Sequence, residues 1–193
     1  MSRVFLDLSM SLDGFVAGPD VGPEQPMGRE GERLHDWMFT GKTDEEAAAF
    51  QTAKFRNVGA VIIGRRTLDL GLGPWGDNPA FHAPCFVVTS RPHETIVREG
   101  GTSYTFVTKG IEGALAQART AAGGKDIMVL GGADLARQYL EARLLDEMQI
   151  HLVPLLLGGG TRLFGESAPP VDLEPIEVAQ GSGVVHLRYR VPR

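Results

Sequence analysis

Short apolar runs that are typical of buried strands occur along the chain, and in its first two thirds they alternate with helical patterns. Strands are expected over about Val4–Ser9, Gly59–Ile63, Cys85–Thr89, Tyr104–Thr108 and Ile127–Leu130. Between the last two runs, apolar residues recur at the spacing of one helix face, from Ile111 to Ala122. A further helix is expected over about Asp134–Arg143. Strands that alternate with helices usually pair in parallel through right-handed crossovers, so this pattern predicts a parallel sheet.

The last third of the chain changes to strand after strand. Strands are expected over about Glu147–Leu157, Leu173–Ala179 and Val184–Val191, and the last of these alternates apolar with polar residues. Gly181-Ser182-Gly183 has the composition of a hairpin turn between the final two. We therefore predict a mixed α/β sheet, mostly parallel with antiparallel C-terminal strands and with helices on both faces. We expect it to form a single domain over residues 1–193.

Two segments are expected to be loops, and one helix is expected between them. Residues 18–42 are rich in glycine, proline and charge, and a loop of this length is usually functional. Gly71–Pro79 carries Trp75 and is expected to be a second loop. Thr43-Asp44-Glu45-Glu46 is a capping box, in which Thr43 is the N-cap and Glu46 the third helical residue. It predicts a helix that runs to about Arg56.

Three of the predicted strands end in a similar kind of sequence. The segments that follow them are Gly64-Arg65-Arg66-Thr67, Thr89-Ser90-Arg91 and Gly131-Gly132-Ala133. In open α/β sheets, ligands bind beyond the carboxyl ends of the strands. Glycine lets the backbone approach a ligand closely, and the first N–H groups of a following helix attract an anion. These three ends are therefore the candidate ligand site.

The residue types at these ends suit the phosphates of a dinucleotide. Arg65, Arg66 and Arg91 can offer guanidinium groups to phosphate oxygens, while Thr67 and Ser90 offer hydroxyl donors. The alternative is that the strand-to-helix turns bind nothing and that each arginine is a solvated surface charge. None of the three ends carries the G-x-G-x-x-G fingerprint or the phosphate-binding G-x-x-x-x-G-K-[ST] loop.

Composition and charge narrow the partners that the chain can have. The net charge is −5 and no basic block occurs, which argues against nucleic acid as a main partner. No apolar run reaches the ~18 residues that a membrane span needs. The single cysteine, Cys85, cannot form an internal disulfide. We expect a cytoplasmic protein that binds a small-molecule substrate, without nucleic acid, membrane or metal.

Three residues are candidates for contact with that substrate. Asp13 follows the first strand and is the candidate for anchoring the substrate or delivering a proton, although Asp13-Gly14 is equally a turn signal. Trp37 and Phe39 lie in the long loop. Their rings can stack on a planar heterocycle, or they can pack in the core.

Five motifs occur in order over nearly the whole chain: Ser11–Ala17, Val61–Thr67, Val87–Pro92, Val129–Ala133 and Pro154–Gly160. Together they resemble the dihydrofolate reductase superfamily. The closer resemblance is to the reductase domain of the bifunctional riboflavin-biosynthesis deaminase–reductases (RibD C-terminal-like) and to its stand-alone bacterial relatives. The resemblance implies NADPH, with its adenosine phosphate end at Gly64–Thr67 and Ser90-Arg91 and its pyrophosphate and nicotinamide at Gly131-Gly132. It also implies a homodimer.

Two departures from the resembled families limit what the resemblance implies. The zinc motif of the deaminase half is absent, and one cysteine cannot build that site. Folate reductases carry a carboxylate on their first helix, but here the capping box already accounts for Glu46, and the folate role is not assigned. We expect an NADPH-dependent reductase, similar to 5-amino-6-(5-phosphoribosylamino)uracil reductase, that transfers a hydride to a C=O or C=N group of a pyrimidine- or pteridine-like substrate. The alternative is a non-catalytic NADPH-binding or dimeric sensor protein of the same fold.

Overall fold

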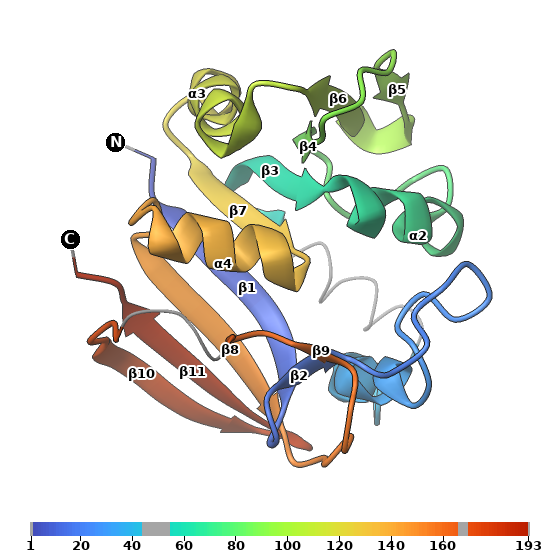
Figure 1. Cartoon of the computed structure of the whole chain (residues 1–193), viewed down its shortest axis with the longest axis vertical. Helices are drawn as coiled ribbons and strands as arrows, with labels where there is room; N and C mark the ends of the chain where they lie inside the picture. Colours follow the sequence, from blue (N-terminus) through green and yellow to red (C-terminus); the bar gives the residue numbers. More distant parts are fainter. Residues whose placement is uncertain (1, 44–54, 166–169, 193) are drawn as a thin grey trace.

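A computed structural model describes residues 2–43, 55–165 and 170–192, and over these residues the centre of the fold is a nine-stranded sheet (Figure 1). Its strands are β1 (Val4–Ser11), β3 (Val58–Gly64), β4 (Pro84–Val88), β5 (Ile96–Val97), β6 (Ser103–Val107), β7 (Asp126–Gly131), β8 (Glu147–Val153), β10 (Glu174–Gly181) and β11 (Val184–Arg190). They lie in the order β10-β11-β8-β1-β7-β3-β4-β6-β5. A small second sheet pairs β2 (Phe15–Ala17) with β9 (Thr161–Arg162).

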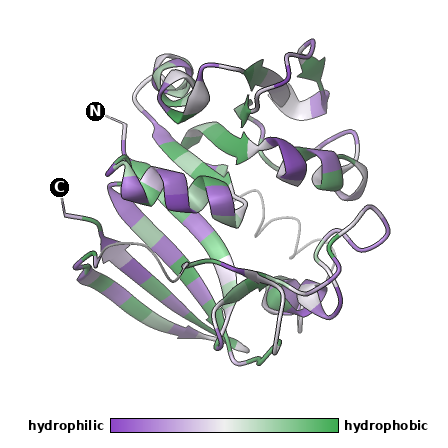
Figure 2. Cartoon of the chain, in the orientation of Figure 1, coloured by the Kyte–Doolittle hydropathy of each residue, from purple (hydrophilic) through white to green (hydrophobic). Residues whose placement is uncertain are grey.

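The predicted mixed sheet is confirmed. The strands from β8 through β1, β7, β3 and β4 to β6 are parallel to their neighbours. The C-terminal strands β11 and β10 add to the β8 edge in antiparallel orientation, as does β5 at the β6 edge. Figure 2 shows the reason in the hydropathy of the chain: β3 is almost continuously hydrophobic, whereas β10 and β11 alternate. Strands that are covered on both faces need continuous apolar runs.

Helices cover the central strands on both faces. The helices α3 (Gly110–Ala122) and α4 (Ala133–Glu141) pack on one face, where Val4 and Leu6 of β1 belong to the same apolar cluster. The helix α2 (Arg65–Trp75) packs on the other face, together with Phe5. Two short 3₁₀ helices, η1 (Gly31–Met38) and η2 (Glu99–Gly101), complete the described elements. Among the residues that the structure describes, no helix is both long and apolar enough to span a membrane.

The predicted loop over Gly71–Pro79 is wrong in its first half, because α2 continues to Trp75. The Trp75 ring folds back over Gly71, where a Cβ atom would lie 2.5 Å from the indole carbons. The same ring packs edge-on against Phe81, with the two ring centroids 5.0 Å apart. Gly71 therefore makes room for an aromatic contact one turn later, and Pro74 stops the helix only at its end.

Residues 18–42 are not a plain loop, because η1 lies within them. This helix buries Leu34, Trp37 and Met38 against Val153 of β8 and Val184 of β11. The predicted strand Glu147–Leu157 is shorter than expected and ends at Val153, since Pro154 has no N–H group to continue the pairing. The short strands β2, β5 and β9 were not predicted. The helix that the capping box predicts from Thr43 to Arg56 lies mostly outside the described residues.

The glycine triplet after β8 supports a prediction about stability. At Gly160, φ is +126° and a Cβ atom would lie 2.1 Å from the carbonyl oxygen of Ala17. At Gly159, nothing lies within 4 Å of the same position. We expect Gly160→Ala to lower the free energy of unfolding by about 2–4 kcal/mol, and Gly159→Ala to change it by under about 0.5 kcal/mol. Urea denaturation measures both, and equal effects would contradict the packing of this loop on β2.

Candidate functional site

The three glycine- and arginine-containing strand ends lie side by side. β7, β3 and β4 are consecutive neighbours in the parallel sheet, and Ile63 pairs with Gly131 while Gly64 pairs with Val88. Their carboxyl ends therefore open on one edge, which we call the β7–β3–β4 edge (Figure 1). The chain order β3, β4, β7 conceals this arrangement, which arises because β7 inserts between β1 and β3.

Two helices begin at this edge, one on each face of the sheet. Gly64 is the N-cap of α2 and Gly132 is the N-cap of α4, and both have extended backbone angles. Because each cap is a glycine, no cap side chain covers the N–H groups of the first turn. The partial positive charges of both helix ends are therefore directed to the same edge, which favours an anion there.

The glycines at the edge form a cradle of bare backbone. A Cβ atom on Gly132 would lie 3.3 Å from Oγ1 of Thr67, and one on Gly131 would lie 3.2 Å from a methyl carbon of Leu8. Gly131 has φ +109°, which L side chains rarely adopt, and the Gly131–Gly132 peptide bond is cis. Gly64 lies close to the same two residues, since a Cβ atom on Gly64 would be 3.6 Å from the Gly131 carbonyl oxygen. This cradle fits the close approach of a dinucleotide pyrophosphate.

The arginines of the α2 first turn already have partners. Nε of Arg65 lies 2.7 Å from a carboxylate oxygen of Asp69, and the Arg65 guanidinium stacks on the Phe106 ring, 5.1 Å from its centroid. Arg66 is exposed and donates a hydrogen bond to the carbonyl oxygen of Val21, at 3.0 Å. Arg66 thereby ties the long loop to the start of α2.

The residues after β4 are more open. Ser90 and Arg91 are exposed, and the Arg91 N–H group donates a 3.1 Å hydrogen bond to Oγ1 of Thr89. That contact turns the chain sharply at the end of the strand. It leaves the Ser90 hydroxyl and the Arg91 guanidinium at the surface, next to the end of β3.

The strands β1 and β7 separate just before this edge. Their ladder ends with the pair Leu6 and Val129, while β1 continues to pair with β8 as far as Ser11 and Val153. Leu8 is the β1 side chain nearest to Gly131. The cradle therefore lies beside the part of β1 that has left its β7 neighbour.

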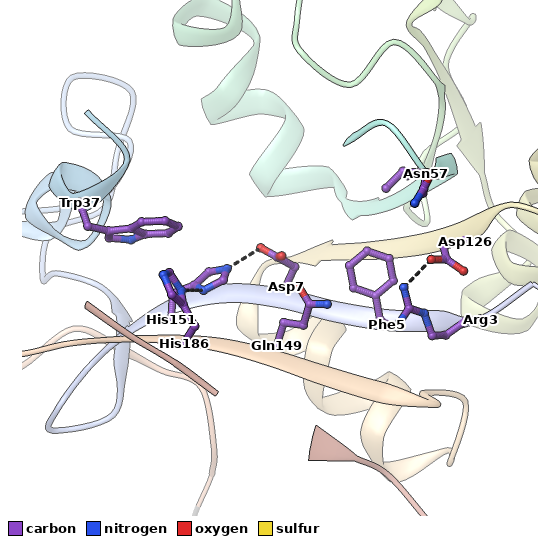
Figure 3. A pocket seen from close by; sticks show the side chains of 10 residues that line it. Arg3, Phe5, Asp7, Trp37, Asn57, Asp126, Gln149, His151 and His186 are labelled. Atoms are coloured by element: carbon purple, nitrogen blue, oxygen red, sulfur yellow. Dashed lines mark hydrogen bonds and ion pairs between the residues drawn. The ribbon is translucent and has the colours of Figure 1, made fainter. Parts of the chain in front are cut away.

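A cavity of about 320 Å³ lies on the face of β1 that carries Phe5 and Asp7 (Figure 3). One end of it, which we call the histidine pocket, is lined by Asp7, Trp37, Gln149, His151 and His186. These residues come from β1, η1, β8 and β11. They meet because Asp7 is opposite Gln149, Ser9 is opposite His151, and His151 is opposite His186 in the sheet.

The two histidines of this pocket contact each other. Their Nδ1 atoms are 2.8 Å apart, and Nε2 of His151 lies 3.4 Å from a carboxylate oxygen of Asp7 (Figure 3). The Trp37 ring packs on both, with centroid distances of 4.8 Å to His151 and 5.0 Å to His186. The Trp37 Nε1–H group donates to Oγ of Ser9, at 3.2 Å. The indole is therefore held in one orientation over the pocket.

At the other end of the cavity, the charges compensate one another. Arg3 contacts the carboxylate oxygens of Asp126 at 2.5 Å and of Glu147 at 2.8 Å. Burial opposes the charge of Arg3, but these two carboxylates outweigh it and raise the pKa of the guanidinium above its ordinary value. This end of the cavity is a fixed ionic network.

A family model of the RibD C-terminal domain matches residues 2–187. The chain belongs to the RibD C-terminal domain family. YwjB, an uncharacterised protein of Bacillus subtilis, is 26% identical over 200 residues that cover 97% of each chain. The chain is also similar to a crystal structure from Shewanella sp. PV-4 that is described as a riboflavin biosynthesis protein. The TM-score is 0.74 at 24% identity, with full coverage of both chains. The riboflavin biosynthesis reductase Rib7 of Saccharomyces cerevisiae has a TM-score of 0.62 at 15% identity, over 100% of this chain and 90% of that one.

These findings confirm the resemblance to the RibD C-terminal domain that the five motifs predicted, and the solved structures share its fold. Gly71–Gly76 matches the pattern G-x-G-x-x-G, but it forms the end of α2 instead of the turn between a strand and a helix. It is therefore not a dinucleotide fingerprint.

The side chain of Asp13 is engaged in hydrogen bonds that hold a loop in place. Its Oδ1 atom accepts hydrogen bonds from the Ser11 hydroxyl at 2.6 Å and the Leu157 N–H group at 3.1 Å, and its Oδ2 atom accepts one from Gly158 N–H at 2.7 Å. The Ser11 hydroxyl, followed by the backbone N–H groups, lowers the pKa of Asp13 below its ordinary value of 3.8. An ionised carboxylate with both oxygens engaged anchors a loop, and we do not assign proton delivery to it.

The Asp13 contacts predict a specific pH dependence of stability. Because the folded-state pKa is lowered, the contribution of Asp13 is complete above its unfolded-state pKa of about 4 and is lost as the pH falls through the folded-state value. We expect wild type and Asp13→Asn to differ in unfolding free energy by a constant amount near neutral pH. This difference should shrink below about pH 4. Urea denaturation across this range tests it, and a difference that stays constant down to about pH 2 would contradict it.

The other two predicted substrate residues have different environments in the RibD C-terminal domain. Trp37 is buried and lines the histidine pocket, whereas Phe39 is 53% exposed at the end of η1. Sequence reasoning missed Asp7, His151 and His186. A signal for Asp7 was present, because Asp7 and Ser9 alternate with Leu6 and Leu8 and so place polar groups on one face of a buried strand.

Proposed function

We propose that this chain is an NADPH-dependent reductase that transfers a hydride to a C=O or C=N group of a small heterocycle, with pyrimidine-like compounds as the leading class. The observation that carries the proposal is the β7–β3–β4 edge, where two helix N-termini and a glycine cradle share one place. Membership of the RibD C-terminal domain family supports it, as does the fold shared with a riboflavin biosynthesis reductase.

The residues of the edge would hold the cofactor in two parts. Gly64–Thr67 together with Ser90 and Arg91 would bind the adenosine phosphate end, because a hydroxyl and a guanidinium lie exposed there. Gly131, Gly132 and Ala133 would bind the pyrophosphate and the nicotinamide through backbone N–H groups. When bound, NADPH supplies the hydride, while the chain positions the substrate and excludes water.

The histidine pocket would hold the substrate. Its wall is the indole of Trp37, and aromatic faces stack on flat heterocycles. Its floor carries the carboxylate of Asp7 and the amide of Gln149, which can match the N–H and C=O groups along a pyrimidine edge. Asp7 directly follows Leu6, the last β1 residue paired with β7. A heterocycle in this pocket would therefore lie near the nicotinamide end of the cradle.

Oxidation of NADPH in the presence of candidate substrates tests the proposal. We expect the absorbance of NADPH to fall when at least one compound of a test panel is added. The panel contains aminopyrimidines (with and without a ribose phosphate), pteridines and simple carbonyl compounds. NADPH labelled with deuterium at C4 should slow the single-turnover rate. Binding of NADPH without oxidation by any compound would instead favour a cofactor-binding sensor of the same fold. Absence of NADPH binding would overturn the cofactor site.

The family resemblance also supports a homodimer, which we include in the proposal. Sedimentation equilibrium at several protein concentrations tests it. A mass that stays at that of one chain over the whole range would contradict the homodimer without affecting the reductase assignment.

A further inference from the structure

The wall of the cavity carries more negative than positive charge on its acidic residues and arginine. Its described lining contains two carboxylates, on Asp7 and Asp126, and one guanidinium group, on Arg3. The side-chain amides of Asn57 and Gln149 add no charge. An anionic ligand in this cavity would therefore meet more like charge than opposite charge, unless the histidines compensate for it.

The two histidines of the pocket do not supply that compensation. Their Nδ1 atoms are 2.8 Å apart, and two such nitrogens form a hydrogen bond only when one of them carries no proton. In this arrangement the pair carries at most one positive charge. Nε2 of His151 lies 3.4 Å from a carboxylate oxygen of Asp7, so that carboxylate offsets such a charge (Figure 3). The histidine pocket is therefore neutral or negative.

The guanidinium group of Arg3 is matched by more negative charge than it can neutralise. Its Nη2 atom lies 2.5 Å from a carboxylate oxygen of Asp126, and its Nη1 atom lies 2.8 Å from one of Glu147. A guanidinium group binds phosphate best when both of its terminal nitrogens face the phosphate oxygens. Here both nitrogens already face carboxylates. A phosphate at Arg3 would have to displace one of these carboxylates or lie beside both of them.

Two further cations contact residues of this region, and both have partners inside the chain. Nε of Arg188 lies 3.8 Å from Glu147, and Nη1 of Arg188 lies 3.5 Å from Glu177. Nζ of Lys42 donates a 3.1 Å hydrogen bond to the carbonyl oxygen of Trp37. Neither cation belongs to the lining of the cavity. Their contacts therefore do not change the balance of charge on its wall.

The cavity is also small for a nucleotide. Its volume of about 320 Å³ is at the low end of the range of roughly 300–1,000 Å³ that is usual for small-molecule sites. A heterocycle stacked on Trp37 would occupy the histidine pocket. Figure 3 shows Arg3 and Asp126 at the end of the cavity away from Trp37. A ribose phosphate attached to the heterocycle and directed along the cavity would therefore reach the carboxylates around Arg3.

The histidine pocket contains a buried polar atom that a neutral ligand can satisfy. His151 is 9% exposed, and its Nε2 atom has no hydrogen-bond partner among the residues that the structure describes. Gln149 lies beside it on the same strand, opposite Asp7. An N–H or C=O group of a flat ring could bond to these side chains without bringing a charge into a buried place. Burial of an anion there would be costly, because an uncompensated charge loses its hydration.

We propose that the substrate of this pocket is a pyrimidine-like heterocycle that carries no phosphate. This inference rests on the proposed function, because it narrows the ligand of the same site. A free base or a nucleoside brings no negative charge to the wall. A phosphorylated analogue is rejected by repulsion from the carboxylates around Arg3, which act against the wrong ligand instead of for the right one. The preferred substrate therefore differs from the 5-amino-6-(5-phosphoribosylamino)uracil that the family resemblance implies.

Isothermal titration calorimetry with cytosine, cytidine and cytidine 5′-monophosphate tests the proposal. Excess NADP⁺ is present, so that the phosphate compound cannot bind at the proposed cofactor site instead. We expect the dissociation constant of the monophosphate to exceed that of cytidine by about 10-fold or more. This ratio should shrink when salt rises from about 50 to 500 mM, because salt screens the repulsion. Binding of the monophosphate as tightly as cytidine would overturn the proposal, as would no binding of cytosine and cytidine.

Charge variants separate repulsion from a simple lack of room. Asp126→Asn should lower the ratio of the two dissociation constants by about threefold or more, by tightening the binding of the monophosphate. Glu147→Gln is a second variant for the same test, and thermal unfolding checks that each is folded. Glu112→Gln is the matched control, because Glu112 is exposed on α3, which covers the opposite face of the sheet. A ratio that Asp126→Asn and Glu147→Gln leave unchanged, or that Glu112→Gln lowers equally, would overturn the proposal.

Turnover separates this proposal from the one on which it rests. With NADPH, kcat/KM for a phosphate-free compound should exceed that of its phosphorylated counterpart by about 10-fold or more. A higher kcat/KM for the phosphorylated compound would overturn the ligand class and leave the reductase assignment intact. Binding of cytidine with the expected ratio, but without oxidation of NADPH by any compound, would overturn the reductase assignment and leave the ligand class intact.

Discussion

Gly132→Val should weaken the proposed NADPH binding by about 100-fold or more while leaving the domain folded. At Gly132, φ is −72° and ψ is −160°, which valine adopts without strain. Its Cβ atom would lie 3.3 Å from Oγ1 of Thr67, so the branched side chain would fill the cradle between the starts of α2 and α4. We expect the dissociation constant for NADPH to rise by about 100-fold or more, which corresponds to about 2.7 kcal/mol.

Isothermal titration calorimetry measures this effect, and thermal unfolding checks the fold. Gly22→Val is the matched control, because nothing lies within 4 Å of its Cβ position and its φ is not in the left-handed region. It should bind NADPH like wild type. Wild-type affinity in a folded Gly132→Val variant would remove the glycine cradle from the cofactor site.

Trp37→Ala should have the largest effect on stability among single substitutions around the histidine pocket. The indole is 7% exposed, contacts both histidines and bonds to Ser9. Truncation of a buried tryptophan costs about 3–5 kcal/mol through lost contacts and the cavity that remains. We expect a loss in this range from urea denaturation, with Trp37→Phe losing less because its ring still packs on the histidines.

The control for Trp37 is Leu12→Ala, because Leu12 is 61% exposed and should change the free energy of unfolding by under about 0.5 kcal/mol. Substrate binding gives a second readout. Trp37→Phe should bind a pyrimidine substrate more weakly than wild type while keeping NADPH affinity. A loss below about 1 kcal/mol for Trp37→Ala would show that η1 is not packed on the sheet.

The sequence was sufficient to predict the central sheet, because parallel strands that are buried on both faces need continuous apolar runs, and such runs are easily recognised in a sequence. The run Ile127–Leu130 predicts β7 to within two residues, and the alternation from Val184 predicts β11 equally well. The sequence was less informative where the contacts of an aromatic side chain override the intrinsic helix or loop propensity of the residues around it. Trp75 extends α2 through two glycines and a proline, and Trp37 fixes η1 within a glycine-rich segment.

Half of the candidate site was predictable for the same kind of reason. Glycines and arginines directly after buried strands follow a rule that ties ligands to carboxyl ends, so the β7–β3–β4 edge could be found from sequence. The histidine pocket could not, because His151 and His186 are 35 residues apart and meet only through the antiparallel register of β8 and β11. For Asp13 the sequence left open a turn residue on one side and substrate anchoring or proton delivery on the other, and its hydrogen bonds within the loop favour the turn.

The outermost strand has a consequence for self-association. Between Pro175 and Glu177 the pairing of β10 with β11 shifts by a bulge, and Pro175 has no N–H group to offer to another strand. Salt bridges from Glu177 to Arg188 and from Glu174 to Arg190 add charge along the same strand. An incoming β-strand could therefore extend the sheet over little more than Val178–Gly181. The β10 edge is therefore protected against edge-to-edge strand pairing between copies of the chain. A stable partner at this edge must bind through side-chain contacts and not by extending the sheet.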